Sequence, residues 1–334
     1  NYFNFGNTGT VWKGGTIDLQ VGTVLLGNPT FEGGAENNIF FSGPKWQFWS
    51  LATPIPWSVT FKKETTLELG ESLVSGAYST NCNIFAGPFK FENNVTIHGY
   101  SGKLNPGRCM TFAGPVSSAA GKILYLGGYN PQVYFAHANT FHGLSIAASA
   151  GAKAHALADG ALPSIANETH YLSLHGNNAD CGEADIWLGD GLCTSPWVAK
   201  AIASMDTWNG IAGSAKLGLR TSGDFTFDAD IPEPSTETEK DRISNVGISH
   251  VGTGTLTYAG SFPSASDRKV RIIQREANTT VLGAPDGETV VGFTDNADPK
   301  APRHYYLKVG EERDGWKVLE ADAAKAWMKI AKDE

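Results

Sequence analysis

A short motif recurs along the chain and constrains the fold more than any other feature of the sequence. The residues Asn-Cys-Asn-Ile-Phe-Ala-Gly-Pro-Phe at 81–89 are followed 27 residues later by Arg-Cys-Met-Thr-Phe-Ala-Gly-Pro-Val at 108–116. A shorter copy, Phe-Ala-His, stands at 135–137. An earlier Phe-Ser-Gly-Pro at 41–44 precedes Phe85 by two steps of about 22 residues. Repeat periods of about 20 to 50 residues indicate units that stack on one another.

The composition and charge of the chain exclude some classes of function. The 334 residues carry a formal net charge of -8, and 18% of them are charged, against about 25% in an average protein. A nucleic-acid-binding surface needs clustered lysine and arginine, so we expect no nucleic-acid partner. Without an apolar run of about 18 residues, we expect no membrane span. Because the chain begins at Asn1 without a leader, we interpret it as a mature or excised piece of a secreted, extracellular bacterial protein.

Short runs of alternating apolar and polar residues dominate the first two thirds of the sequence. Examples are residues 16–21, 66–69, 123–126 and 224–227, and such runs end near Gly, Pro, Asn or Asp, which is typical of strands. We predict no amphipathic helix between residues 10 and 230, which excludes a parallel α/β sheet. A β-sandwich does not explain why the motif repeats. A right-handed parallel β-helix explains it, because the phenylalanines would stack inside successive coils and Gly-Pro would form the corner of each coil.

One segment resembles a known repeat. Asn-Thr-Phe-His-Gly-Leu at 139–144 is followed by Ala-Gly-Ala at 150–152 and by Ala-Asp-Gly-Ala-Leu at 158–162. This order is similar to the passenger-associated repeat of autotransporter-like proteins. The resemblance implies a right-handed β-helix of an exported bacterial protein, and it concerns the fold and not the activity.

We predict one all-β domain over residues 1–334, with regular coils at 10–231. Residues 232–241 are rich in Pro, Ser, Thr and Glu and predict a linker or a long loop. Residues 242–318 are expected to form further coils or a subdomain. In the Ala-rich segment 319–332, the apolar residues share one helical face, which predicts a helix that caps the end of the solenoid.

The four cysteines suggest disulfides and not a zinc site, because none forms a Cys-x-x-Cys pair. Cys82 and Cys109 occupy equivalent places in successive repeats, so their strands would lie about 4.8 Å apart, within reach of a disulfide. Cys181 and Cys193 could close a second loop in the same way. The alternative is a ladder of reduced, buried cysteines, whereas disulfides would fit an oxidising compartment.

Acidic residues offer a catalytic alternative. A glycosidase needs two carboxylates about 5 to 9.5 Å apart, and Asp180, Glu183, Asp185 and Asp190 lie close together in the sequence. The β-helix pectin hydrolases and lyases carry paired aspartates and basic residues, whereas only the triplet Asn-Ala-Asp at 178–180 matches here. A solvated or calcium-binding turn is the favoured interpretation, and a structural calcium ion is the one cofactor left open.

Aromatic residues give the more specific hypothesis. In a strand over residues 45–50, alternation puts Trp46 on one face and Gln47 with Trp49 on the other, so one of these sets faces outward. Flat rings stack on the apolar face of a sugar while polar neighbours bind its hydroxyls, and the alternative is that the rings fill the inside of the coils. The candidate ligand-binding residues are Trp46, Gln47, Trp49, Trp57, Trp197 and Trp208.

These observations favour a secreted carbohydrate-binding module without catalytic residues. Its size, acidity, β-helix texture and aromatics make the chain similar to carbohydrate-binding module family 89, which implies a xylan ligand and a catalytic domain outside this chain. Two alternatives remain: a β-helix polysaccharide lyase or glycoside hydrolase, and a structural passenger of the adhesin or autotransporter type.

Overall fold

The structure of the protein is a computed structural model. It describes residues 2–6, 9–20, 22–48, 54–69, 83–99, 108–128, 131–146, 152–163, 171–177, 180–189, 192–208, 215–231, 246–260, 271–274, 279–283, 289–295, 303–322 and 327–332.

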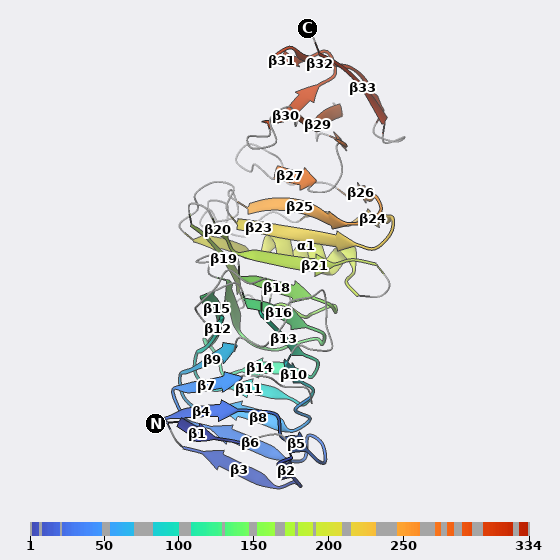
Figure 1. Cartoon of the computed structure of the whole chain (residues 1–334). Coiled ribbons are helices and arrows are strands. Elements are labelled where there is room, and N and C mark those ends of the chain that lie inside the picture. The colour runs from blue at the N-terminus through green and yellow to red at the C-terminus, as the bar shows by residue number, and fades with distance from the viewer. Residues whose placement is uncertain are drawn as a thin grey trace.

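Most strands belong to sheets in which the neighbours run parallel, and strands that are separated in the sequence follow one another in each sheet (Figure 1). The ten-stranded sheet contains β1 (Tyr2–Asn4), β4 (Thr23–Leu26), β7 (Lys45–Phe48), β9 (Thr65–Leu69), β12 (Val95–Gly99), β15 (Ile123–Gly128), β17 (Gly143–Ile146), β19 (Tyr171–Asn177), β22 (Met205–Trp208) and the short antiparallel β20 (Asp180–Cys181). The eight-stranded sheet contains β10 (Asn83–Phe85), β13 (Arg108–Phe112), β16 (Pro131–Phe135), β18 (Lys153–Ala156), β21 (Glu183–Trp187), β23 (Ala215–Thr221), β25 (Val246–Gly252) and β27 (Arg271–Gln274).

Three smaller parallel sheets complete this stack. The five-stranded sheet contains β3 (Thr16–Leu19), β6 (Asn38–Phe41), β8 (Ser58–Phe61), β11 (Phe89–Phe91) and β14 (Val116–Ser118). Two separate parallel pairs also occur: β2 (Val11–Trp12) with β5 (Thr30–Phe31), and β24 (Phe225–Phe227) with β26 (Leu256–Tyr258). The chain is therefore all-β with parallel sheets, which agrees with the predicted class.

The recurring motif stacks its phenylalanines in the core. Phe85 pairs with Phe112, and Phe112 pairs with Phe135, in the register of the eight-stranded sheet. Their rings are nearly parallel, with centroids 5.5 Å and 5.4 Å apart, and all three side chains are buried. The predicted inward stack of the motif at 85, 112 and 135 is confirmed.

Ala-Gly-Pro follows Phe85 and Phe112, and the second of these corners stacks its backbone on the first. The amides of Ala113 and Gly114 both donate to the carbonyl of Phe85, at 2.9 and 3.0 Å. A Cβ atom on Gly114 would lie 2.4 Å from the carbonyl oxygen of Gly87, so the glycine is required by close approach of the two backbones.

The copy at 41–44 is not part of this column, which corrects the predicted steps of about 22 residues. Phe41 belongs to the five-stranded sheet and pairs with Phe61, whereas the earlier residue that bridges to Phe85 is Ile55. The Gly-Pro at 43–44 turns a different corner, between β6 and β7, so the similarity reflects the chemistry of corners and not one repeated position.

Both helix predictions are wrong. A helix, α1 (Ser195–Ala203), occurs where we expected none, and it buries Trp197, Val198 and Ile202 in the core. Conversely, the predicted cap at 319–332 contains the antiparallel strands β32 (Trp316–Asp322) and β33 (Trp327–Lys332). Strand pairing overrides the helix propensity of this Ala-rich segment.

The C-terminal part differs from the rest. The predicted linker at 232–241 lies outside the described residues. Beyond it, β25 and β27 continue the eight-stranded sheet in parallel. Two antiparallel sheets follow: β28 (Thr279–Gly283), β29 (Thr289–Asp295) and β30 (Arg303–Lys308), and then β31 (Glu312–Arg313) with β32 and β33. The described part of the chain contains no helix that is long and apolar enough to cross a membrane.

Candidate functional site on the outer face of the eight-stranded sheet

The predicted tryptophan platform is wrong for three of its members. Trp46 and Trp57 are fully buried, and Trp197 is 5% exposed. On β7 the alternation places Trp46 and Phe48 inside, where their rings stack at 5.3 Å. The indole nitrogen of Trp57 donates to the backbone carbonyl of Glu32. These rings are core residues and cannot stack on a sugar in this structure.

The other predicted ligand-binding residues contribute little to a platform. Gln47 faces outward from β7, and its amide donates to Glu68 at 2.9 Å, while Glu68 also forms an ion pair with Lys45. Trp49 lies outside the described residues. Trp208 ends β22, and its side chain also lies outside the described part of the structure.

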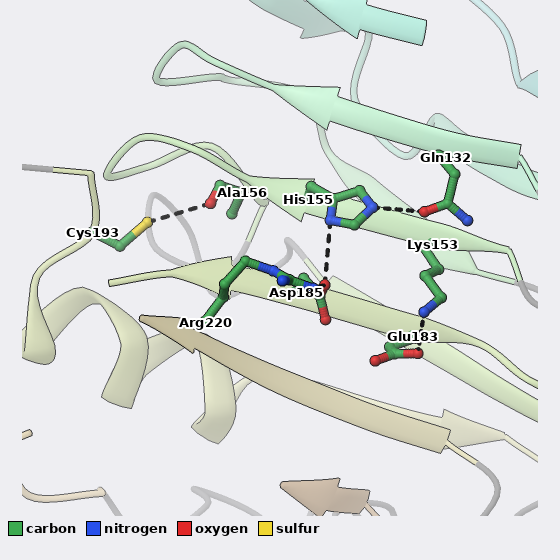
Figure 2. Close-up of polar contacts among 8 residues, drawn as sticks. All are labelled: Gln132, Lys153, His155, Ala156, Glu183, Asp185, Cys193 and Arg220. Atoms are coloured by element: carbon green, nitrogen blue, oxygen red, sulfur yellow. Dashed lines mark hydrogen bonds and ion pairs between the residues drawn. The ribbon is translucent and has the colours of Figure 1, made fainter. Parts of the chain in front are cut away.

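Charged and aromatic side chains instead gather on the outer face of β18, β21 and β23, which lie one after another in the sheet (Figures 1 and 2). Alternation puts the alanines and aliphatic residues of these strands into the core, so that every second side chain points away from it. We call this surface the polar face; its members are Lys153, His155, Glu183, Asp185, Trp187, Gly218 and Arg220.

Asp185 is the centre of the polar face. Its side chain is 0% exposed, and its Oδ2 accepts a hydrogen bond from Arg220 Nη2 at 2.9 Å. His155 Nδ1 lies 3.4 Å from the same oxygen, a close charge contact without hydrogen-bond geometry. Gly218 leaves room for this carboxylate, because a Cβ atom there would lie 2.1 Å from Asp185 Oδ1.

The environment of Asp185 keeps it ionised. Burial alone raises the pKa of this carboxyl, but the close contact with the His155 imidazole and the hydrogen bond and charge of Arg220 outweigh burial and hold the pKa well below its usual range. Asp185 is therefore a carboxylate over the whole physiological pH range.

Two further contacts fix the neighbouring side chains, as Figure 2 shows. Lys153 Nζ lies 2.8 Å from Glu183 Oε2, and these residues are direct partners in the register of β18 and β21. His155 Nε2 lies 2.8 Å from Gln132 Oε1, and the imidazole stacks on Tyr134 with centroids 4.3 Å apart. The polar face is thus a network of paired charges.

An aromatic side chain borders this network. Trp187 is half-buried and packs against an apolar cluster of Cys109, Tyr134 and Leu157. The guanidinium carbon of Arg220 lies 5.2 Å from the indole ring, within cation–π range. Trp187 is therefore a partly exposed ring held beside ion-paired charges.

Several buried polar atoms of the polar face have unused hydrogen-bonding capacity. In the described part of the chain, six buried side-chain polar atoms have no hydrogen-bond partner, and four of them belong to the polar face: His155 Nδ1, Asp185 Oδ1, Trp187 Nε1 and Arg220 Nε. Because buried polar groups in native proteins are almost always satisfied, this concentration sets the polar face apart from the rest of the described structure.

Sequence reasoning found Glu183 and Asp185 as acidic residues but missed their basic partners. Lys153, His155 and Arg220 lie on the neighbouring strands β18 and β23, so nothing in the local sequence connects them to the acids. One pattern in the sequence could have predicted this pairing. Lys-Ala-His-Ala at 153–156 carries basic residues at the two positions where Glu-Ala-Asp-Ile at 183–186 carries acidic ones, and the two segments are paired in register. Asp190 and the side chain of Asp180 lie outside the described residues.

The cysteines do not support the second predicted loop. Cys109 is disulfide-bonded, whereas its predicted partner Cys82 lies outside the described residues. Cys193 is a free, buried thiol, whose sulfur lies 3.7 Å from the carbonyl oxygen of Ala156. The predicted bridge between Cys181 and Cys193 is therefore wrong. Burial, together with the charge of Asp159, raises the pKa of the Cys193 thiol far above its usual range.

No group of three or more His, Cys, Asp or Glu side chains that could hold a metal ion occurs in the part of the chain that the structure describes. Comparison with protein-family models, with curated proteins and with solved structures finds no match for the chain.

Proposed function

We propose that this chain is a right-handed parallel β-helix of an exported protein that binds a polysaccharide on its polar face, without catalysis. The parallel sheets that gain one strand per passage of the chain are the pattern of such a helix. Xylan is the first ligand to test. We also propose that the module is linked to a catalytic domain outside this chain and holds that domain on the polysaccharide.

One observation carries the proposal. Trp187, a half-buried aromatic ring, lies beside Arg220, Lys153 and two carboxylates on one flat sheet face. A ring supplies apolar contact area to a sugar, and charged groups exchange hydrogen bonds with its hydroxyls. The face is also continuous with the in-register strands of neighbouring coils, so it extends in the direction of a polymer.

The charges favour binding over hydrolysis. A glycosidase needs one protonated carboxyl to serve as the general acid, whereas the contacts with His155 and Arg220 keep Asp185 ionised. Glu183 is 3% exposed at its side chain and ion-paired with Lys153. Neither carboxyl is placed as an acid that could donate a proton to a leaving group.

A structural passenger is the second candidate, because three of the four predicted binding residues whose side chains the structure describes are core. The burial of Trp46, Trp57 and Trp197 shows that aromatic content alone does not indicate a ligand in this chain. A stalk would use the same rings only to fill its interior.

A retention assay separates these functions. The purified chain is incubated with insoluble xylan, pectin, alginate and β-glucan, and bound protein, new reducing ends and unsaturated uronate are measured together. Retention without product supports the module, and product formation supports the enzyme. Neither retention nor product supports the structural passenger.

The assay has a matched pair of variants. Trp187→Ala should weaken retention about tenfold, because an aromatic contact contributes about 1 kcal/mol or more. Phe3→Ala removes an aromatic ring that is 45% exposed on β1, far along the sheets from the polar face, and should leave retention unchanged. Equal loss in both variants would contradict the assignment of the polar face.

A further inference from the structure

The charges of the polar face are paired within the protein. Lys153 contacts Glu183 at 2.8 Å, and Arg220 contacts Asp185 at 2.9 Å. The two cations are 28% and 30% exposed at their side chains, whereas the two carboxylates are 3% and 1% exposed. A ligand on the polar face therefore contacts Lys153 and Arg220, whose charges are already neutralised by the buried carboxylates of Glu183 and Asp185.

This pairing disfavours an anionic ligand. A uronate carboxylate that binds Lys153 or Arg220 competes with a carboxylate of the protein that is buried and cannot turn to water. Separating either pair leaves a buried charge without its counterion, which is strongly destabilising. The formal net charge of -8 also repels a polyanion at long range.

A neutral ligand avoids this cost. Its hydroxyl groups can accept hydrogen bonds from the partly exposed side chains of Lys153 and Arg220 without displacing the carboxylates that neutralise them, whereas a ligand carboxylate would also meet the like charge of Asp185.

We infer that the polar face selects neutral polysaccharides and rejects uronate polymers, and that Glu183 sets this selectivity by neutralising Lys153. The inference rests on the proposed function and names the class of its ligand. Its consequence is a change of specificity: Glu183→Gln should free Lys153 for a ligand carboxylate at nearly constant side-chain shape.

The test measures binding of wild-type protein and variants to neutral xylan, mannan and β-glucan, and to polygalacturonate and alginate, at low and high salt. Wild type should bind a neutral polymer at least about tenfold more tightly than either polyanion. Glu183→Gln should gain about tenfold for the polyanions, and salt should abolish this gain because it is electrostatic.

Glu92→Gln is the matched control. Glu92 is ion-paired with Lys90 at 3.4 Å on and beside β11, and both side chains are exposed. The control changes the net charge by the same amount and releases a lysine away from the polar face, so it should not gain polyanion binding.

The outcomes distinguish the inference from the function on which it rests. Wild-type binding to a polyanion that equals or exceeds binding to every neutral polymer would overturn the inference and leave polysaccharide binding intact. A folded Glu183→Gln protein that gains no more than Glu92→Gln would also overturn it. If wild type binds no polysaccharide at all, the proposed function fails and the inference fails with it.

Discussion

Gly114 is the position where a single methyl group should damage the stack of coils most directly. In Gly114→Ala the new Cβ would lie 2.4 Å from the carbonyl oxygen of Gly87 and 2.7 Å from that of Ala86. Both are backbone atoms of the neighbouring corner, so neither can rotate away as a flexible side chain would. The two corners must separate.

The expected cost follows from the contacts that separation disturbs. Overpacking of a tight site costs about 1 to 3 kcal/mol. The hydrogen bonds from Ala113 and Gly114 to Phe85, at 2.9 and 3.0 Å, must lengthen as well, and each contributes about 1 kcal/mol. We therefore expect Gly114→Ala to lower the free energy of unfolding by about 3 kcal/mol.

Urea unfolding followed by circular dichroism measures this loss, with hydrogen exchange over residues 108–118 to localise it, because stacked repeats can unfold in parts. Gly127→Ala is the matched control: the glycine lies on β15, and its Cβ would meet no atom within 4 Å. The control should change stability by about 0.5 kcal/mol or less. Equal stability of Gly114→Ala and wild type would refute the close approach of the corners.

Three further predictions concern burial. Asp185→Asn should lower the free energy of unfolding by about 3 kcal/mol at pH 7, because it leaves the Arg220 cation without its counterion. The pKa of Asp185 is lower in the native state than in the unfolded state, so the stability difference between wild type and variant is present above about pH 4 and should shrink as the pH falls below it. Urea unfolding at pH 7 and at pH 3 measures this change. Phe112→Ala should cost about 3 to 5 kcal/mol by thermal unfolding, because it leaves a cavity in the ring stack. Cys193 should not react with a thiol reagent at pH 8 until the protein unfolds, because it is buried and its pKa is raised; rapid labelling of the native protein would contradict its position.

The strand pattern and the motif predicted the parallel stack because both depend on local chemistry that repeats. Phe85, Phe112 and Phe135 each precede a corner, and in a stacked fold equal positions come together. The same reasoning failed at Phe41, because Gly-Pro suits any corner and the sequence does not say which sheets a corner joins.

The face of a strand was the harder question. Alternation over residues 45–50 correctly separated Trp46 from Gln47, but it left open which of them was inside. The core decided it: Trp46 packs against Phe41, Phe48 and Phe61, and this apolar contact area outweighs any exposure of the indole to a ligand.

The sequence by itself determined the all-β class, the parallel stacking of the repeated motif and the acidic character of the chain, because these follow from periodicity, from equivalent positions and from composition. Only the tertiary structure decided which aromatic rings are inside and which charges meet. Lys153, Asp185 and Arg220 are far apart in the sequence and become neighbours because they lie on the adjacent strands β18, β21 and β23. Their pairing depends on the lengths of the connections between these strands, which vary along this chain and which no local pattern records.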